Sequence, residues 1–132
     1  MKLEFISASS FESNVKCSIH KNGKLGFSSS ACTKLKIEAG KSVLFAKNSE
    51  DVKEENLYIV VQDSNEVDGF RLNKAGNYFY LNTKALFDEL GIDYRSKSIV
   101  YDVVNTDMMH EDNKVFKLIK REVGSRKEKR ML

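Results

Sequence analysis

Apolar and polar residues alternate with two different periodicities along this 132-residue chain, one typical of strands and one typical of helices. Alternating positions and short apolar runs, separated by glycine and polar residues, are typical of β-strands. They predict strands over 15–20, 24–27, 42–46, 57–62, 69–72, 78–81, 98–104 and 114–120. Apolar positions at helical spacing, preceded by serine, asparagine or threonine as capping residues, predict short helices over 30–37 and 84–92. We therefore expect a mainly β protein with two short helices.

The second half of the chain repeats the order of the first half. Four features recur: a Lys-x-Gly turn, a Leu-x-Ile helix end, a Lys-Ser strand start and a last apolar strand. They begin at residues 21, 35, 41 and 57, and again at 74, 90, 97 and 115. The offset drifts smoothly, as short loop insertions would produce. The pattern predicts duplicated ββαββ units, residues 13–62 and 70–121, packed as one domain because about 50 residues bury too little surface alone.

Three further segments lie outside these units. Residues 1–12 are predicted as an N-terminal edge segment with a strand over 2–6, residues 63–69 as a linker, and residues 122–132 as a basic, disordered tail. Acidic clusters at 50–55, 63–68 and 107–112 are interpreted as loops.

Composition places the chain among folded domains that lie outside the membrane. Hydrophobic residues make up 41% and charged residues 31%. No apolar run approaches the roughly 18 residues of a membrane-spanning helix, and the N-terminus lacks the pattern of a secretory signal. We therefore expect a cytoplasmic protein with no membrane partner. In that compartment Cys17 and Cys32, which lack metal-ligand spacing, are expected to be reduced thiols.

Positive charge is concentrated in the first unit, although the net charge is only +3. Between residues 14 and 47 a single acid, Glu38, faces seven bases: Lys16, Lys21, Lys24, Lys34, Lys36, Lys41 and Lys47. A local basic surface in a nearly neutral protein indicates contact with a polyanion. A solvated lysine-rich face is the alternative explanation.

The run from Gly23 to Phe45 has a glycine followed by a base, a short strand, a helix ending in Leu-x-Ile, and then Gly-x-x-Val-x-Phe. It resembles the swapped-hairpin pattern of the AbrB/MazE/SpoVT DNA-binding family, as does the second unit in its Leu-Gly-Ile at 90–92. In that family two hairpin units, usually from two chains, interlock in a small barrel that binds DNA in regulators and antitoxins. The resemblance implies an AbrB-like, pseudo-twofold β-barrel built from tandem units of one chain. Ser28, Cys32, Lys36 and Lys41 replace the proline, arginine, glycine and aspartate of the pattern.

The resemblance places the family's basic positions at Lys24 and, displaced by two residues, at Lys34. Together with the local charge, it predicts DNA contacts from Lys21, Asn22, Lys24, Lys34, Lys36 and Lys41. Secondary contacts are expected from Lys74, Lys84, Arg126, Lys127, Lys129 and Arg130. Duplex DNA is the favoured ligand, in transcriptional control or in an antitoxin-like pair. Residues 1–62 hold no arginine for bidentate guanine contacts, so weak sequence specificity is expected.

Two other functions remain open at this point. Tyr78 and Tyr80 share one face of a predicted strand, where they could stack unpaired bases of a single strand. Such a pair more often covers a core or a partner surface. A protein-interaction module, including a homodimer, is the other alternative, and its expected sign is an exposed apolar patch or an open sheet edge.

Catalysis is not expected from this sequence. The two histidines, His20 and His110, lie in different predicted units, and no Gly-x-Ser-x-Gly or phosphate-binding glycine motif occurs. The acids of 107–112 lack the spacing of a calcium loop. We therefore predict a binding protein with no cofactor and no metal.

Overall fold

The computed structural model describes residues 1–6, 15–64 and 68–126. Its elements are β1 (Lys16–Ile19), β2 (Leu25–Phe27), α1 (Ser29–Leu35), β3 (Ser42–Ala46), β4 (Leu57–Gln62), β5 (Phe70–Arg71), β6 (Asn73–Ala75), β7 (Tyr78–Leu81), α2 (Lys84–Glu89), β8 (Lys97–His110) and β9 (Asn113–Ser125). The prediction of a mainly β protein with two short helices is confirmed for these residues.

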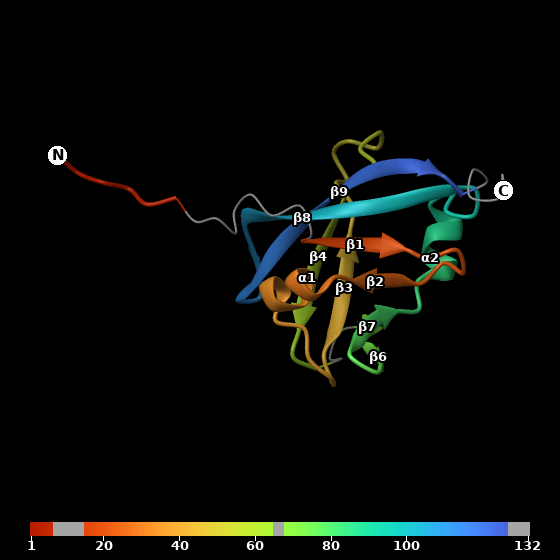
Figure 1. Ribbon diagram of the computed structural model, residues 1–132, viewed down its shortest axis with the longest axis horizontal. Helices are drawn as coiled ribbons and strands as arrows, with labels where there is room; N and C mark the ends of the chain where they lie inside the picture. The colour runs from red at the N-terminus through yellow and green to blue at the C-terminus, as the bar shows by residue number, and fades with distance from the viewer. Residues whose placement is uncertain (7–14, 65–67, 127–132) are drawn as a thin grey trace, which may run out of the picture.

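The described strands form one antiparallel sheet of nine strands, in the order β5-β3-β4-β9-β8-β1-β2-β7-β6. This sheet curls into a nearly closed, barrel-like shape (Figure 1). Its first and last strands, β5 and β6, are separated in the chain by Leu72 alone. The Leu72 amide donates to the carbonyl of Lys41, which precedes β3, at 3.1 Å. The two ends of the strand order therefore meet at one residue.

Strand pairs join the two halves of the chain at four places. β1 pairs with β8, β2 with β7, β3 with β5, and β4 with β9. The hairpins β1–β2, β3–β4, β6–β7 and β8–β9 supply the other pairs. Because backbone groups buried in a sheet need hydrogen-bond partners, each half depends on the other to complete its ladders.

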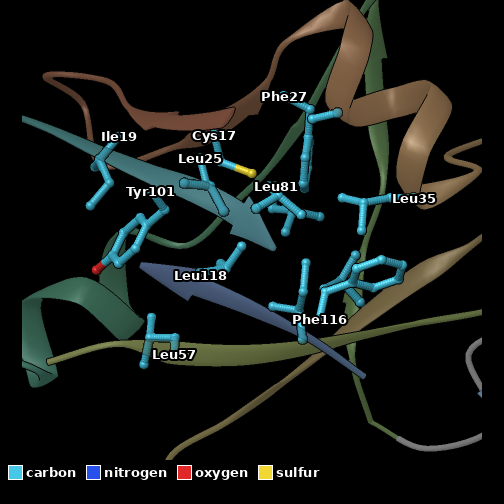
Figure 2. Close-up of a cluster of buried hydrophobic side chains, with 14 of the residues drawn as sticks. Cys17, Ile19, Leu25, Phe27, Leu35, Leu57, Leu81, Tyr101, Phe116 and Leu118 are labelled. Carbon is cyan, nitrogen blue, oxygen red and sulfur yellow. The ribbon is translucent and has the colours of Figure 1, made fainter. Parts of the chain in front are cut away.

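Side chains from both halves fill the interior of the barrel (Figure 2). Cys17 and Leu25 of the first half and Leu81, Tyr101 and Leu118 of the second are fully buried. These residues alternate with outward-facing ones along their strands, as a half-buried strand requires. Cys17 is a free, buried thiol, and burial raises its pKa far above the usual range.

The two helices begin in different ways. The Ser28 hydroxyl caps α1 by accepting from the Ala31 amide at 3.1 Å, and it also accepts from the Lys16 amide at 3.2 Å. Thr83 occupies the capping position of α2 without capping it. Its hydroxyl instead donates to the Gly23 carbonyl at 3.0 Å, sixty residues away in the chain. This bond joins the start of α2 to the β1–β2 turn.

The strand predicted over 69–72 is shorter, β5, and a separate strand, β6, follows it over 73–75, while the helices predicted over 30–37 and 84–92 end earlier, at Leu35 and Glu89. Three larger differences concern the acidic run, the N-terminal segment and the C-terminal tail. Residues 107–112 were expected to be a loop, but β8 continues to His110 and only Glu111 and Asp112 turn, with φ of 47° and 69°. A register shift between Asn105 and Met109 lets the β8–β9 ladder continue. Residues 1–6 form no strand, and residues 7–12 lie outside the described residues.

The third difference concerns the predicted tail. β9 continues to Ser125, so the tail cannot begin at residue 122. The Arg126 guanidinium then donates to the carbonyls of Tyr94 and Ile19, each at 2.7 Å. Arg126 is thereby fixed against the barrel, and residues 127–132 lie outside the described part of the chain.

Neither helix in the described residues is long and apolar enough to cross a membrane.

The β1–β2 turn offers a test of how the halves pack. Gly23 has φ of +88°, and an added Cβ would lie 2.8 Å from Lys84 Cβ and 2.9 Å from Lys84 Cα. We expect Gly23→Ala to lower the free energy of unfolding by about 3 kcal/mol, from left-handed backbone strain plus overpacking.

Gly76→Ala is the matched control, because Gly76 has φ of +62° with nothing within 4 Å of an added Cβ. It should cost only about 1 kcal/mol. Urea unfolding measures both, and equal losses would contradict the contact between turn and helix.

Candidate nucleic-acid interface

The outer surface of β1, β2 and β7 gathers polar, basic and aromatic side chains. Leu25 pairs with Leu81, and Gly26 with Tyr80, so alternate positions of β2 and β7 face outward together. We call this surface the hairpin face and define it by His20, Lys21, Asn22, Lys24, Gly26, Tyr78 and Tyr80. Residues that are more than fifty positions apart in the chain thus share one face of the sheet.

Tyr78 lies across β2 and reaches His20. Its hydroxyl hydrogen-bonds to His20 Nε2, and the two rings meet edge to face with centroids 5.6 Å apart. Gly26 makes room for this crossing, since an added Cβ there would come within 2.6 Å of His20 Nε2 and would also clash with the Tyr78 hydroxyl. Tyr78 remains 38% exposed. Tyr78 therefore does not cover the core, and the other half of the expectation, that the tyrosine pair covers a partner surface, stays a prediction.

Lys24 is positioned over the neighbouring tyrosine. Its ammonium nitrogen lies 4.7 Å from the centroid of the Tyr80 ring, within the range of a cation–π contact. The turn that carries Lys24 is held by its own hydrogen bonds. The Asn22 side-chain oxygen accepts from the Lys24 amide at 3.1 Å, and the His20 amide donates to the Lys24 carbonyl at 2.8 Å. Lys21 and Asn22 are exposed at the tip of this fixed turn.

Burial and neighbouring charges keep His20 neutral near pH 7. Partial burial lowers the pKa of His20 first, and the positive charges of Arg126 and Lys24 lower it further. Burial also raises the pKa of the Tyr78 hydroxyl, so this group stays protonated. The positive potential of the hairpin face therefore comes from its lysines rather than from His20.

The lysines of the first half are short of acidic partners. Among the described residues, Lys41 is the only one of the seven bases between 14 and 47 with a carboxylate oxygen within 4.0 Å. Cations later in the chain have closer partners: Lys84 lies 2.8 Å from Asp88, and Arg121 2.7 Å from Asp102. Charge without a nearby counterion leaves a positive potential at the surface of the first half.

The six predicted primary contacts form two groups instead of one face. Lys21, Asn22 and Lys24 lie in the β1–β2 turn, whereas Lys34, Lys36 and Lys41 follow at and beyond the end of α1. The turn and α1 lie at opposite ends of β2 (Figure 1). Because the chain runs along β2 and then through α1, the later lysines are carried away from the turn.

The second group surrounds a cavity of about 410 Å³. We call this cavity the lysine pocket. It is lined by Lys34, Leu35, Lys36, Lys41, Val61, Asp63, Asn105, Asp112, Asn113, Lys114 and Phe116. Lys114, which the sequence did not single out, joins the three predicted lysines because the long β8–β9 hairpin ends beside α1 (Figure 1).

The six predicted secondary contacts fall into four situations. Lys84 lies beside the β1–β2 turn but is paired with Asp88 at 2.8 Å. Lys74 in β6 has its Nζ 5.7 Å from the Phe79 ring centroid. Arg126 is occupied by backbone carbonyls, which removes it as a freely moving contact. Lys127, Lys129 and Arg130 lie outside the described residues.

A second hollow is mostly apolar. A groove of about 700 Å³ lies between the outer surface of β3 and β4 and the end of the β8–β9 hairpin. Leu44, Tyr58, Val60, Met108 and Met109 contribute to its wall, and both methionines are exposed. Such a surface is the sign expected of a protein-interaction module, which stays a prediction.

No group of three or more histidine, cysteine or acidic side chains that could hold a metal occurs in the described residues.

Comparisons with protein-family models, with curated proteins and with solved structures found no match. The AbrB-like resemblance therefore stays a prediction, and function has to be inferred from the geometry of the chain itself.

The His20 environment predicts a pH dependence. Its pKa is lower in the folded state than in the unfolded chain, so protonation favours unfolding. The contribution of His20 to stability should be complete above about pH 6.5 and lost as the pH falls through the folded pKa. We expect unfolding experiments between about pH 7 and pH 5 to show a decline that His20→Gln reduces.

Nuclear magnetic resonance (NMR) titration of the histidine ring tests the cause directly. In Lys24→Ala the pKa of His20 should move up toward its ordinary value, because one repelling charge is gone. An ordinary His20 pKa in the unmodified protein would contradict this description of the hairpin face.

Proposed function

We propose that the protein binds duplex DNA through the hairpin face. The observation that carries this proposal is the cluster of lysines without acidic partners on a fixed turn, beside the exposed ring of Tyr78 and the half-buried ring of Tyr80. Lys21 and Lys24 supply the positive charge, and Asn22 between them supplies an amide that can donate to phosphate oxygens. Phosphate contacts of this kind provide most of the affinity of sequence-independent binding.

The way in which lysine recognises phosphate limits the expected specificity. Its ammonium group is a point charge that favours phosphate over bidentate reading of base edges. The hairpin face, as defined above, contains no arginine. We therefore propose weak sequence preference, in a transcriptional regulator or an antitoxin-like component, with DNA shape contributing where the turn enters a groove.

We also propose that the barrel is an internal duplication of the swapped-hairpin kind. The pairing scheme supports this, because exchanging the two halves exchanges β1–β2 with β6–β7 and β3–β4 with β8–β9. If β5 and β6, which only Leu72 separates, are taken together as one interrupted strand that corresponds to β1, the same exchange turns β1–β8 into the β5–β3 pair and leaves β2–β7 and β4–β9 in place. Under this proposal the turn at Gly76 is the counterpart of the turn at Gly23, with Asn77 in the position of Lys24.

Single-stranded nucleic acid is the second candidate, and the exposure of Tyr78 favours it. Tyr78 and Tyr80 lie on the outer surface beside Lys24, which combines a stacking platform with a cation. Stacking of a base on an aromatic ring contributes about 1–3 kcal/mol and tolerates any sequence. A single-strand binder would therefore depend on the tyrosines, whereas a duplex binder would depend on the turn lysines.

Fluorescence anisotropy across a salt series tests the proposal with Lys21→Ala/Lys24→Ala. We expect duplex affinity to fall at least tenfold at low salt. The slope of log K against log salt should become shallower by roughly 2, since about 0.9 counterion is released per phosphate contact. The matched control is Lys97→Ala/Lys117→Ala, which removes the same charge from lysines that already have acidic partners.

The outcomes separate the candidates. If both double variants lose affinity equally, only net charge matters and the hairpin face is not the interface. If single strands bind more tightly than duplex, and Tyr78→Leu/Tyr80→Leu abolishes this preference, the second candidate replaces the first. If neither form of DNA binds at low salt, both nucleic-acid proposals fail.

A further inference from the structure

The lysine pocket is lined by residues from both halves of the chain. The end of α1 and the residue before β3 contribute Lys34, Leu35 and Lys41. The end of β4 contributes Val61, β8 contributes Asn105, and the first residues of β9 contribute Lys114 and Phe116. Local geometry fixes these segments. Lys36 adopts φ of 56° and its amide closes the helix on the carbonyls of Cys32 and Thr33. The rim of the pocket is thus held by a helix end and a tight strand turn.

Its charges do not balance. Lys41 is already neutralised, since its Nζ lies 3.7 Å from Glu38 and 3.6 Å from Asp63 and donates to the Lys36 carbonyl at 2.8 Å. The Asp63 carboxylate, which lines the pocket, is therefore already paired with the Lys41 ammonium group. Within the described ranges, no carboxylate oxygen lies within 4.0 Å of Lys34, Lys36 or Lys114. Asp112 also lines the pocket, so its four lysines face two aspartates, Asp63 and Asp112, and an excess of positive charge remains. An anion between the lysines would relieve their mutual repulsion.

The remaining lining is partly apolar and partly amide. Leu35, Val61 and Phe116 form an apolar wall, and Lys114 Nζ lies 5.8 Å from the Phe116 ring centroid. The side chains of Asn105 and Asn113 each offer a hydrogen-bond donor and an acceptor. A volume of about 410 Å³ falls within the range of small-molecule sites, roughly 300–1,000 Å³, and is too small for a folded partner.

We propose that the lysine pocket binds a small phosphate-bearing molecule of about mononucleotide size. The lysines hold the phosphate, because ammonium groups form short, charge-assisted hydrogen bonds to phosphate oxygens. The apolar wall and the two asparagines contact the organic part of the ligand. This site is separate from the hairpin face, since the two lie at opposite ends of β2 (Figure 1), and it does not depend on DNA binding.

Calorimetric titration of the full chain with AMP and with inorganic pyrophosphate tests this inference at low salt. We expect at least one of the two probes to bind, and Lys34→Ala/Lys114→Ala to weaken that binding at least tenfold. Lys21→Ala/Lys24→Ala is the matched control, because it removes the same charge from the hairpin face and should change binding less than twofold. Lys34→Arg/Lys114→Arg preserves the charge and should retain binding.

NMR locates the site independently of affinity. The backbone amide signals of Lys36, Asn105 and Asn113 should shift when the bound probe is added, while those of Lys21 and Asn22 should not. Thermal unfolding of each variant verifies that it is folded before its binding is compared.

The inference is overturned if neither probe binds, or if the pocket and hairpin variants lose binding to the same extent. Its failure is distinguishable from that of the proposed function. If Lys21→Ala/Lys24→Ala abolishes DNA binding but leaves AMP or pyrophosphate binding intact, the protein has two separate sites. If the protein binds DNA but neither probe, the proposed function stands and the inference about the lysine pocket fails.

Discussion

The pairing of β2 with β7 is the constraint on which the rest of the structure depends. It joins the two halves at the backbone and fixes Leu25 opposite Leu81 on the core side. On the outer side the same register sets Gly26 opposite Tyr80, and it lets Tyr78 cross the glycine to reach His20. A shift of β7 by one residue would turn Leu81 outward and Tyr78 and Tyr80 toward the core. Core packing therefore fixes the geometry of the surface that we propose binds DNA.

The two halves of the barrel differ in how their charges are paired, a difference that the net charge of +3 does not reveal. In the second half, acids and bases lie close together across strands or helix turns, as with Arg121 and Asp102. In the first half, the described lysines between residues 14 and 47, apart from Lys41, have no carboxylate oxygen within 4.0 Å. The β1–β2 turn holds one group of lysines on an exposed tip, and the end of α1 holds another group around a hollow. An exposed tip suits an extended polyanion, whereas a hollow of limited volume suits a small one.

Local patterns predicted the elements well and their partners poorly. The bounds expected for β3, β4 and β7 match the structure, because glycines and polar residues end these apolar runs. A serine was the expected cap of the first helix, and Ser28 does cap α1. The length of β8 and β9 was missed, since an acidic run from Asp107 to Asp112 resembles a loop unless its strand partner is known. The role of Arg126 was missed for a similar reason, because its acceptors are carbonyls that only the folded chain brings near.

The candidate site was predictable in its residue types and not in its arrangement. The lysine excess between residues 14 and 47 and the alternation of Tyr78 with Tyr80 are visible in the sequence. Their meeting on one face depends on the β2–β7 register, and the separation of Lys34 and Lys36 from the turn depends on the direction of α1.

Isotope-labelled NMR of the full chain during titration with a short DNA duplex tests the hairpin face most directly. Amide signals of residues 20–26 and 78–81 should shift while those of β3 and β4 stay unchanged. Shifts confined to the β3–β4 surface, or no shifts at low salt, would contradict DNA binding at this face.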